Sequence, residues 1–167
     1  MRKELLTFEE YFWGLTKEDF KATSDLVKVF MKAYWHEIEL PKQSKILNHE
    51  IDLFIAQHYR ETQFLIQFGI WRLQSVFESL LKTNFSIQTK NGLSSILKIL
   101  KSKGYKIIKE KELWQWANLR NRLSHTAPEV IHPCPTNLIE QDIEDFSTLL
   151  LEIYDNLEIQ KAKSGNK

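Results

Sequence analysis

The feature that most constrains the fold is a long run of apolar residues at helical spacing. Between positions 51 and 81 they recur every three or four residues, as on one face of a helix: Ile51, Phe54, Ile55, Phe64, Leu65, Phe68, Trp71, Leu73, Val76, Phe77, Leu80 and Leu81. The run predicts one very long helix, or two helices joined by a bend between Arg60 and Gly69. Glycine weakens a helix interior by about 1 kcal/mol, so Gly69 marks either a kink or a point of close packing.

Similar patterns elsewhere in the chain predict an all-α protein. Only four prolines and five glycines occur in 167 residues, which permits long helices. Because short connections favour antiparallel neighbours, we expect an antiparallel four-helix-type bundle over residues 48–160. A helical extension over 1–47 precedes it, and a disordered tail over 161–167 follows it.

Charge and cysteine content narrow the classes of function. The net charge of +1 gives no global attraction for nucleic acid, so RNA binding must rest on a local patch. The single cysteine, Cys134, rules out an internal disulfide and fits a cytoplasmic protein. Polar residues interrupt the most apolar region, 64–81, which argues against a membrane span. No predicted helix presents His and acidic residues at ligand spacing, so we expect no metal and no cofactor, and a metal hydrolase is a weak alternative.

The candidate site is the hexapeptide 120–125, Arg-Asn-Arg-Leu-Ser-His, which closes a helix containing two tryptophans. Pro128 predicts that this helix ends at about His125, where the helix dipole favours a cation. Arg120 and His125 do not share a face of a straight helix, but they can converge if the last turn frays or tightens. Arginine binds phosphate bidentately and histidine can move a proton, so Arg120, Asn121 and His125 suit phosphate chemistry.

This motif resembles the nuclease motif of the HEPN superfamily: arginine, a polar residue, three more residues and histidine, at the end of the third helix of a four-helix bundle. The resemblance covers roughly residues 48–154 and implies a metal-independent endoribonuclease, usually a homodimer whose two motifs form one composite cleft. The ribose 2′-hydroxyl would attack the adjacent phosphorus and leave 2′,3′-cyclic phosphate ends. The resemblance assigns charge stabilisation to Arg120, proton transfer to His125, and orientation of the phosphate or the imidazole to Asn121.

Other basic residues are weaker candidates for binding RNA. Arg122 can touch the RNA backbone or pair with a carboxylate. Lys109 and Lys111 are also candidates, within a possible basic rim before the site: Lys98, Lys101, Lys103, Lys106, Lys109 and Lys111. A solvated lysine face is the default interpretation of such a run.

The resemblance also bears on regulation. Several HEPN proteins are toxins of toxin–antitoxin pairs or act in antiphage defence, which implies an antitoxin or another regulatory protein as partner. In one branch a nucleotidyltransferase antitoxin modifies a tyrosine two residues after the histidine. That position is Ala127 here, which argues against this form of regulation. The alternative function is a non-catalytic HEPN-like module for dimerisation or for binding a partner or nucleotide; Arg120 would then pair with a carboxylate and His125 would cap the helix end.

Overall fold

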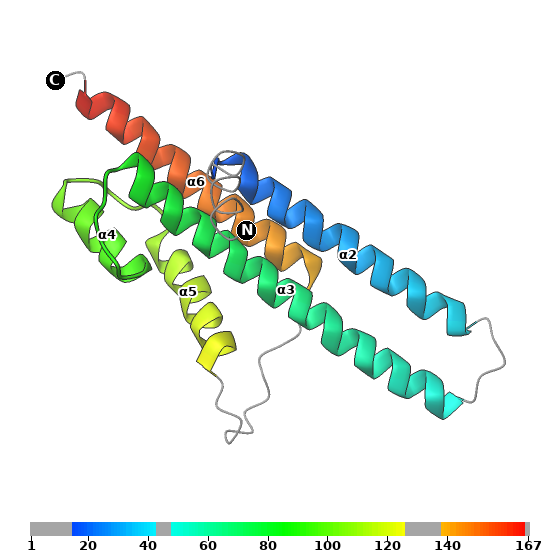
Figure 1. Ribbon diagram of the computed structural model, residues 1–167. Coiled ribbons are helices and arrows are strands. Elements are labelled where there is room, and N and C mark those ends of the chain that lie inside the picture. The colour runs from blue at the N-terminus through cyan, green and yellow to red at the C-terminus, as the bar shows by residue number, and fades with distance from the viewer. Residues whose placement is uncertain (1–14, 43–47, 126–137, 166–167) are drawn as a thin grey trace, which may run out of the picture.

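The structure is a computed structural model, and it describes residues 15–42, 48–125 and 138–165 (Figure 1). Within these ranges the chain forms five helices and no strand, which confirms the all-α prediction: α2 (Glu18–Lys42), α3 (Asn48–Asn84), α4 (Leu93–Ser102), α5 (Glu110–His125) and α6 (Glu140–Gly165). The apolar run at 51–81 lies in one helix of 37 residues, so the unbroken alternative is the correct one.

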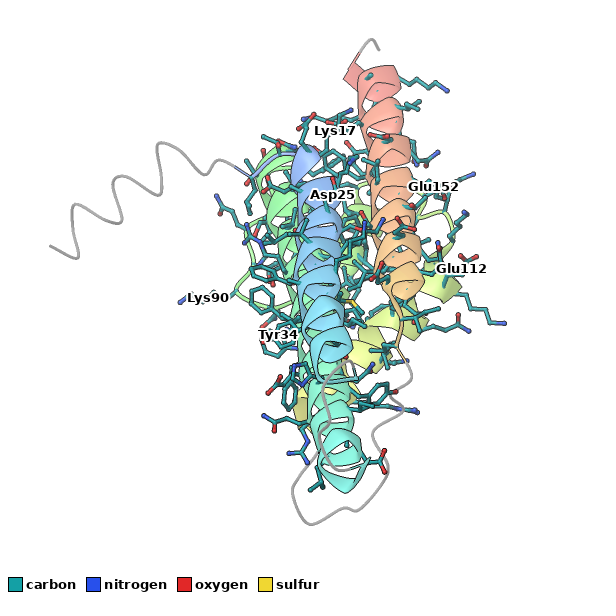
Figure 2. The ribbon with its side chains drawn as sticks, turned by 90° about the vertical axis from the view of Figure 1, so that its right-hand side faces the viewer. Lys17, Asp25, Tyr34, Lys90, Glu112 and Glu152 are labelled. Carbon is teal, nitrogen blue, oxygen red and sulfur yellow. The ribbon has the colours of Figure 1, made fainter. Side chains whose placement is uncertain are left out.

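Three long helices, α2, α3 and α6, pack together around most of the core (Figure 1). The view in Figure 2 looks onto α2, with α6 beside it and with Asp25 and Glu152 labelled on these two helices. Lys28 of α2 pairs with Glu144 near the start of α6, whereas Lys17 lies 3.6 Å from Asp155 further along α6. The helix α2 therefore runs antiparallel to α6.

The helix α3 runs parallel to α6, as contacts advance in the same direction along both helices, so the prediction of an antiparallel bundle over 48–160 is wrong for this pair. Gln63 Nε2 donates to the Leu138 carbonyl at 2.9 Å, just before α6, and Asn84 at the end of α3 bonds to Tyr154. The α2 side chains Phe20, Val27 and Met31 are buried in the same core. Part of the segment predicted as an extension thus completes the core that α3 and α6 begin, because an amphipathic helix is stabilised mainly by burying its apolar face.

The shorter helices α4 and α5 also pack on α3, and α5 lies on the opposite side of α3 from α2 (Figure 1). The indole of Trp116 stacks on the Phe146 ring of α6, with centroids 4.8 Å apart and planes at 20°. Leu113 and Ala117, three residues before it and one after it, are buried. These contacts hold α5 against both α3 and α6 and so fix the helix that carries the candidate motif.

Gly69 of α3 lies in close contact with both α2 and α6. A Cβ atom at this position would lie 2.7 Å from Ile143 Cδ1 and 2.9 Å from Val27 Cγ2, distances below ordinary van der Waals contact. Of the two roles that the sequence allows, the structure therefore assigns close packing to Gly69, because α3 continues through it unbroken.

The end of α4 depends on Gly104, which has a φ of +87°. The Gly104 amide donates to the Lys101 carbonyl at 2.9 Å and the Tyr105 amide to the Leu100 carbonyl at 3.1 Å, the pair of bonds of a Schellman motif. A side chain in the left-handed region costs roughly 1–2 kcal/mol.

We therefore expect Gly104→Ala to lower the free energy of unfolding by about 1 kcal/mol. Gly104→Asn should lower it less, because asparagine tolerates this conformation better. Urea denaturation of the three proteins measures the difference. A Gly104→Ala protein as stable as wild type would contradict this account of the helix end.

The last helix, α6, continues to Gly165, whereas the sequence predicts a disordered tail over 161–167. The Lys161 ammonium donates to the Asn84 carbonyl and lies 5.5 Å from the centre of the Phe85 ring. The Ser164 hydroxyl donates to the Gln160 carbonyl at 2.9 Å. These contacts extend the helix and tie it to the end of α3; residues 166–167 lie outside the described ranges.

Candidate active site

The start of α5 is fixed by contacts of its first acidic residue. Glu110 accepts hydrogen bonds from Lys101 Nζ at 2.7 Å and from the Trp114 indole at 3.1 Å. Both bonds stabilise the carboxylate, with Lys101 the larger cause, so the pKa of Glu110 lies below its usual value. Negative charge in the first turn also suits the helix dipole. The register of α5 is therefore set about three turns before the motif.

Arg120 reaches α3 because it shares a face of α5 with buried residues. Leu113, Ala117 and Arg120 are spaced by four and three residues, so the burial of the first two turns the third toward α3. The Arg120 guanidinium carbon lies 4.4 Å from the centre of the Trp71 ring, a cation–π contact. The side chain is half-buried there. The indole thus holds a permanent cation at the edge of the helical core.

Asn121 is joined to Arg120 by a hydrogen bond. Arg120 Nη1 donates to Asn121 Oδ1 at 3.2 Å, and Asn121 itself is exposed. In this arrangement the amide oxygen orients one edge of the guanidinium. The structure therefore brings two of the three predicted site residues together.

The third predicted site residue, His125, is the last residue of α5, so the predicted end of this helix is confirmed. Its side chain lies outside what the structure describes. Five residues along a helix correspond to about 7.5 Å of rise, so the backbones of Arg120 and His125 are close enough for both side chains to reach one phosphodiester. Arg122, the weaker candidate, is exposed between them.

Two of the candidate RNA-binding lysines lie at the other end of α5. Lys109 precedes the helix, and its ammonium pairs with Glu152 of α6; this hydrogen bond raises the pKa of Lys109. Lys111 is exposed in the first turn, nine residues from Arg120, which corresponds to about 14 Å along the helix. The structure therefore does not bring either lysine next to the motif.

Two other lysines of the predicted basic rim are engaged in local contacts. Lys101 pairs with Glu110, and Lys103 donates to the Phe85 carbonyl at 2.8 Å. Lys98 and Lys106 are exposed on the surface. The solvated-face interpretation therefore describes this rim better than a concentrated phosphate-binding patch does.

Trp71 is the site residue that sequence reasoning missed, since it was counted as one member of an apolar pattern. The sequence nevertheless contained a signal for an exposed aromatic residue at this position. Phe64, Phe68 and Trp71 follow one another at spacings of four and three, on a face of α3 opposite the buried positions Ile66, Ile70 and Leu73. A single helix with apolar residues on two opposite faces has more apolar surface than one core can bury.

Other candidate groups do not converge. Among the described residues, no three His, Cys, Asp or Glu side chains come together as a metal site requires. His58 is buried, with its ring edge-on to Tyr34 at 5.8 Å. Cys134 lies in the segment 126–137, outside the described residues.

Neither family models, nor curated protein sequences, nor solved structures give a match to this chain. None of the described helices combines the length and the apolar character needed to cross a membrane.

Proposed function

We propose that this protein is a metal-independent endoribonuclease that acts as a homodimer, with Arg120, Asn121 and His125 as its site. The observation that supports this most is the setting of Arg120. Its guanidinium lies on the Trp71 ring, is joined to the Asn121 amide, and precedes the end of α5 at His125 by five residues. A guanidinium fixed in this way offers a fork of donors that matches the oxygens of a phosphate.

The chemistry follows from the two ionisable groups. The ribose 2′-hydroxyl attacks the adjacent phosphorus, the bond to the 5′-oxygen breaks, and a 2′,3′-cyclic phosphate and a 5′-hydroxyl result. Arg120 stabilises the charge that builds on the nonbridging oxygens, and its half-buried position strengthens that interaction. His125 transfers the proton, either from the 2′-hydroxyl or to the leaving oxygen. No step requires a metal ion.

The helix order supports a HEPN-like bundle. In this proposal α3, α4, α5 and α6 are the four helices of the family, and α5, the third, ends in the motif. A twofold homodimer would supply a second copy of the motif to a composite cleft. RNA is the substrate, and a role as a toxin or antiphage effector would require an antitoxin or other regulatory partner in the cytoplasm.

The second candidate function is a non-catalytic HEPN-like module for dimerisation or partner binding. The contact of Arg120 with Trp71 favours this function, because a purely structural arginine makes the same contact. RNA cleavage separates the two functions, since the module yields no products.

The test is cleavage of varied RNAs in EDTA by wild type and by His125→Ala, side by side. We expect wild type to leave 2′,3′-cyclic phosphate ends and His125→Ala to lose at least about 100-fold in rate, the usual contribution of a general acid or base. Lys111→Ala is the control, since Lys111 lies at the far end of α5. The proposal fails if folded, dimeric wild type leaves every RNA intact, or if His125→Ala cleaves as fast as wild type.

A further inference from the structure

The outer face of α3 carries a row of exposed aromatic side chains that leads to the candidate site. We call Phe64, Phe68 and Trp71 the aromatic row; their exposed fractions are 59%, 64% and 43%. They follow one another at spacings of four and three residues, so they lie on one side of the helix over a length of about 10 Å. The row ends at Trp71, whose ring is in contact with the Arg120 guanidinium. Exposed apolar residues gathered on one surface usually mark a binding site.

Three of the five arginines in the chain lie beside this row, although lysine is the commoner basic residue. Arg120 reaches one end of the row from α5. Arg60 is exposed and precedes Phe64 by four residues. Arg72 follows Phe68 by the same interval, so each of these two arginines lies beside a ring. Arginine stacks on flat rings and binds phosphate through a fork of donors, which makes it the cation best suited to RNA.

Two acidic residues near the row lie on its α2 side. Asp19 of α2 lies 3.9 Å from Arg72. Glu61 precedes Arg72 by eleven residues, or three turns, so it shares the side of α3 that faces α2. Arg60 precedes Trp71 by the same eleven residues and therefore shares the side that faces α5, where the motif lies. A negatively charged strand is thus favoured along the α5 side of the row.

The apolar area of the row is small for a protein partner. Three half-exposed aromatic side chains, at about 150–250 Å² each when fully buried, contribute roughly 300 Å². Leu26 and Phe30 of α2, which are exposed across the neighbouring groove, raise this to roughly 500 Å². A specific protein interface buries about 800 Å² on each partner. A nucleic acid base needs only one ring to stack on, so the row fits a strand of RNA better than a protein surface.

We propose that the aromatic row is a subsite on which unpaired bases of the RNA stack, on one side of the cleaved phosphate. This deepens the proposed function and rests on it in one respect, that the phosphate beside the row is the one that is cleaved. Arg120 and Asn121 hold that phosphate. Trp71, which is 43% exposed with Arg120 in place, stacks on the adjacent base, and Phe68 and Phe64 stack on the bases beyond it. Rings spread over about 10 Å match about three nucleotides at a spacing of about 3.4 Å.

The first test is fluorescence anisotropy of the full chain carrying His125→Ala, which keeps the RNA intact, with a labelled oligoadenylate of about ten nucleotides, a typical length for single-strand sites. Phe64→Ala and Phe68→Ala, each added to this protein, should raise the Kd about 5- to 150-fold, the loss for one stacked base. Tyr59→Ala is the matched control and should leave the Kd unchanged, because Tyr59 is 40% exposed on the same helix but lines a different surface with Leu138. Circular dichroism checks that all variants are folded.

The second test separates stacking from charge through the salt dependence of binding. Arg60→Ala should lower the slope of log K against log salt by about 0.7, the value for one phosphate contact with a single strand. Phe64→Ala should weaken binding without changing this slope, because stacking releases no counterions. An oligoadenylate paired with oligouridylate should bind more weakly than the single strand, since side chains cannot stack on bases within a duplex.

The inference is overturned if the His125→Ala protein does not bind the oligoadenylate, if Phe64→Ala and Phe68→Ala do not raise its Kd, or if the duplex binds as tightly as the single strand. It is also overturned if these two substitutions dissociate a dimer in sedimentation velocity and leave RNA binding unchanged, because the row is then a protein interface.

The two proposals fail in different ways. Binding that depends on the row, with no cleavage by wild type, supports the subsite and contradicts the nuclease. Cleavage whose kcat/KM is unchanged by Phe64→Ala and Phe68→Ala supports the nuclease and contradicts the subsite. If both proposals hold, Phe64→Ala raises KM and leaves kcat unchanged, because Phe64 lies about 10 Å from Trp71 along α3 and contributes binding away from the reacting phosphate.

Discussion

Arg120→Ala is expected to lower kcat/KM for RNA cleavage by about 100- to 1,000-fold, the range for removing one donor from the charge-stabilising group of an active site. The loss should appear mainly in kcat, because the charge on the phosphate oxygens is greatest in the transition state. Single-turnover cleavage with excess enzyme measures this step directly. The protein should remain folded, since Arg120 is only half-buried.

Two further variants show whether the effect of Arg120 is specific. Arg120→Lys keeps a positive charge but loses the planar fork and the stacking on Trp71, so it should recover only a small part of the lost rate. Arg122→Ala removes an exposed cation two residues away and should change the rate by less than about tenfold, as for a phosphate contact outside the reacting centre. If Arg122→Ala were as damaging as Arg120→Ala, the effect would be general electrostatic attraction and the assigned role of Arg120 would be wrong.

The largest stability effect is expected at Gly69. Gly69→Val should lower the free energy of unfolding by about 3 kcal/mol, the upper part of the range for overpacking a filled core. The reason is that even a Cβ would lie 2.7 Å from Ile143 Cδ1 and 2.9 Å from Val27 Cγ2, and the added methyl groups deepen the overlap. Urea denaturation of the full chain measures the loss.

Gly92 offers a matched control for this glycine. A Cβ at Gly92 would lie 3.5 Å from the Glu78 carboxylate, an ordinary contact, and the residue caps the start of α4. Gly92→Ser should therefore be neutral or slightly stabilising. Gly69→Ala should lower the free energy of unfolding less in an Ile143→Val protein than in wild type. Valine lacks the Cδ1 atom, which is the nearer of the two obstructing atoms. If Gly69→Ala lowered the free energy of unfolding equally in wild type and in Ile143→Val, the proposed steric cause would be wrong.

Much of the helical structure follows from local signals in the sequence. The apolar period predicts α3, and Pro128 predicts that α5 ends at His125. Such features depend on residues close together in the chain. The continuation of α6 beyond Lys161 was missed because it depends on a contact with Asn84, 77 residues away.

Only the contacts between residues adjacent in the sequence could be predicted for the candidate site. Arg120 and Asn121 are adjacent in sequence, so their hydrogen bond needs only the helix. Trp71 comes from another helix, and its role depends on how α5 packs against α3. The placement of Lys109 beside Glu152 likewise depends on α6, and a run of lysines by itself does not reveal its partners. Apolar periodicity also does not distinguish the core face of α3 from its exposed face with Phe64, Phe68 and Trp71, because both have helical spacing.

The parallel arrangement of α3 and α6 has a consequence for biosynthesis. Their contacts join residues 70 to 77 positions apart, and Phe146 of α6 also holds Trp116 of the motif-bearing helix. A nascent chain that ends before α6 can pair α2 with α3, but α5 then lacks its contact with α6. Because contacts distant in sequence form late, the stacking of Trp116 on Phe146 forms only after α6 has been translated. If the chain is the ribonuclease that we propose, its motif-bearing helix would gain its full support only when synthesis is nearly complete.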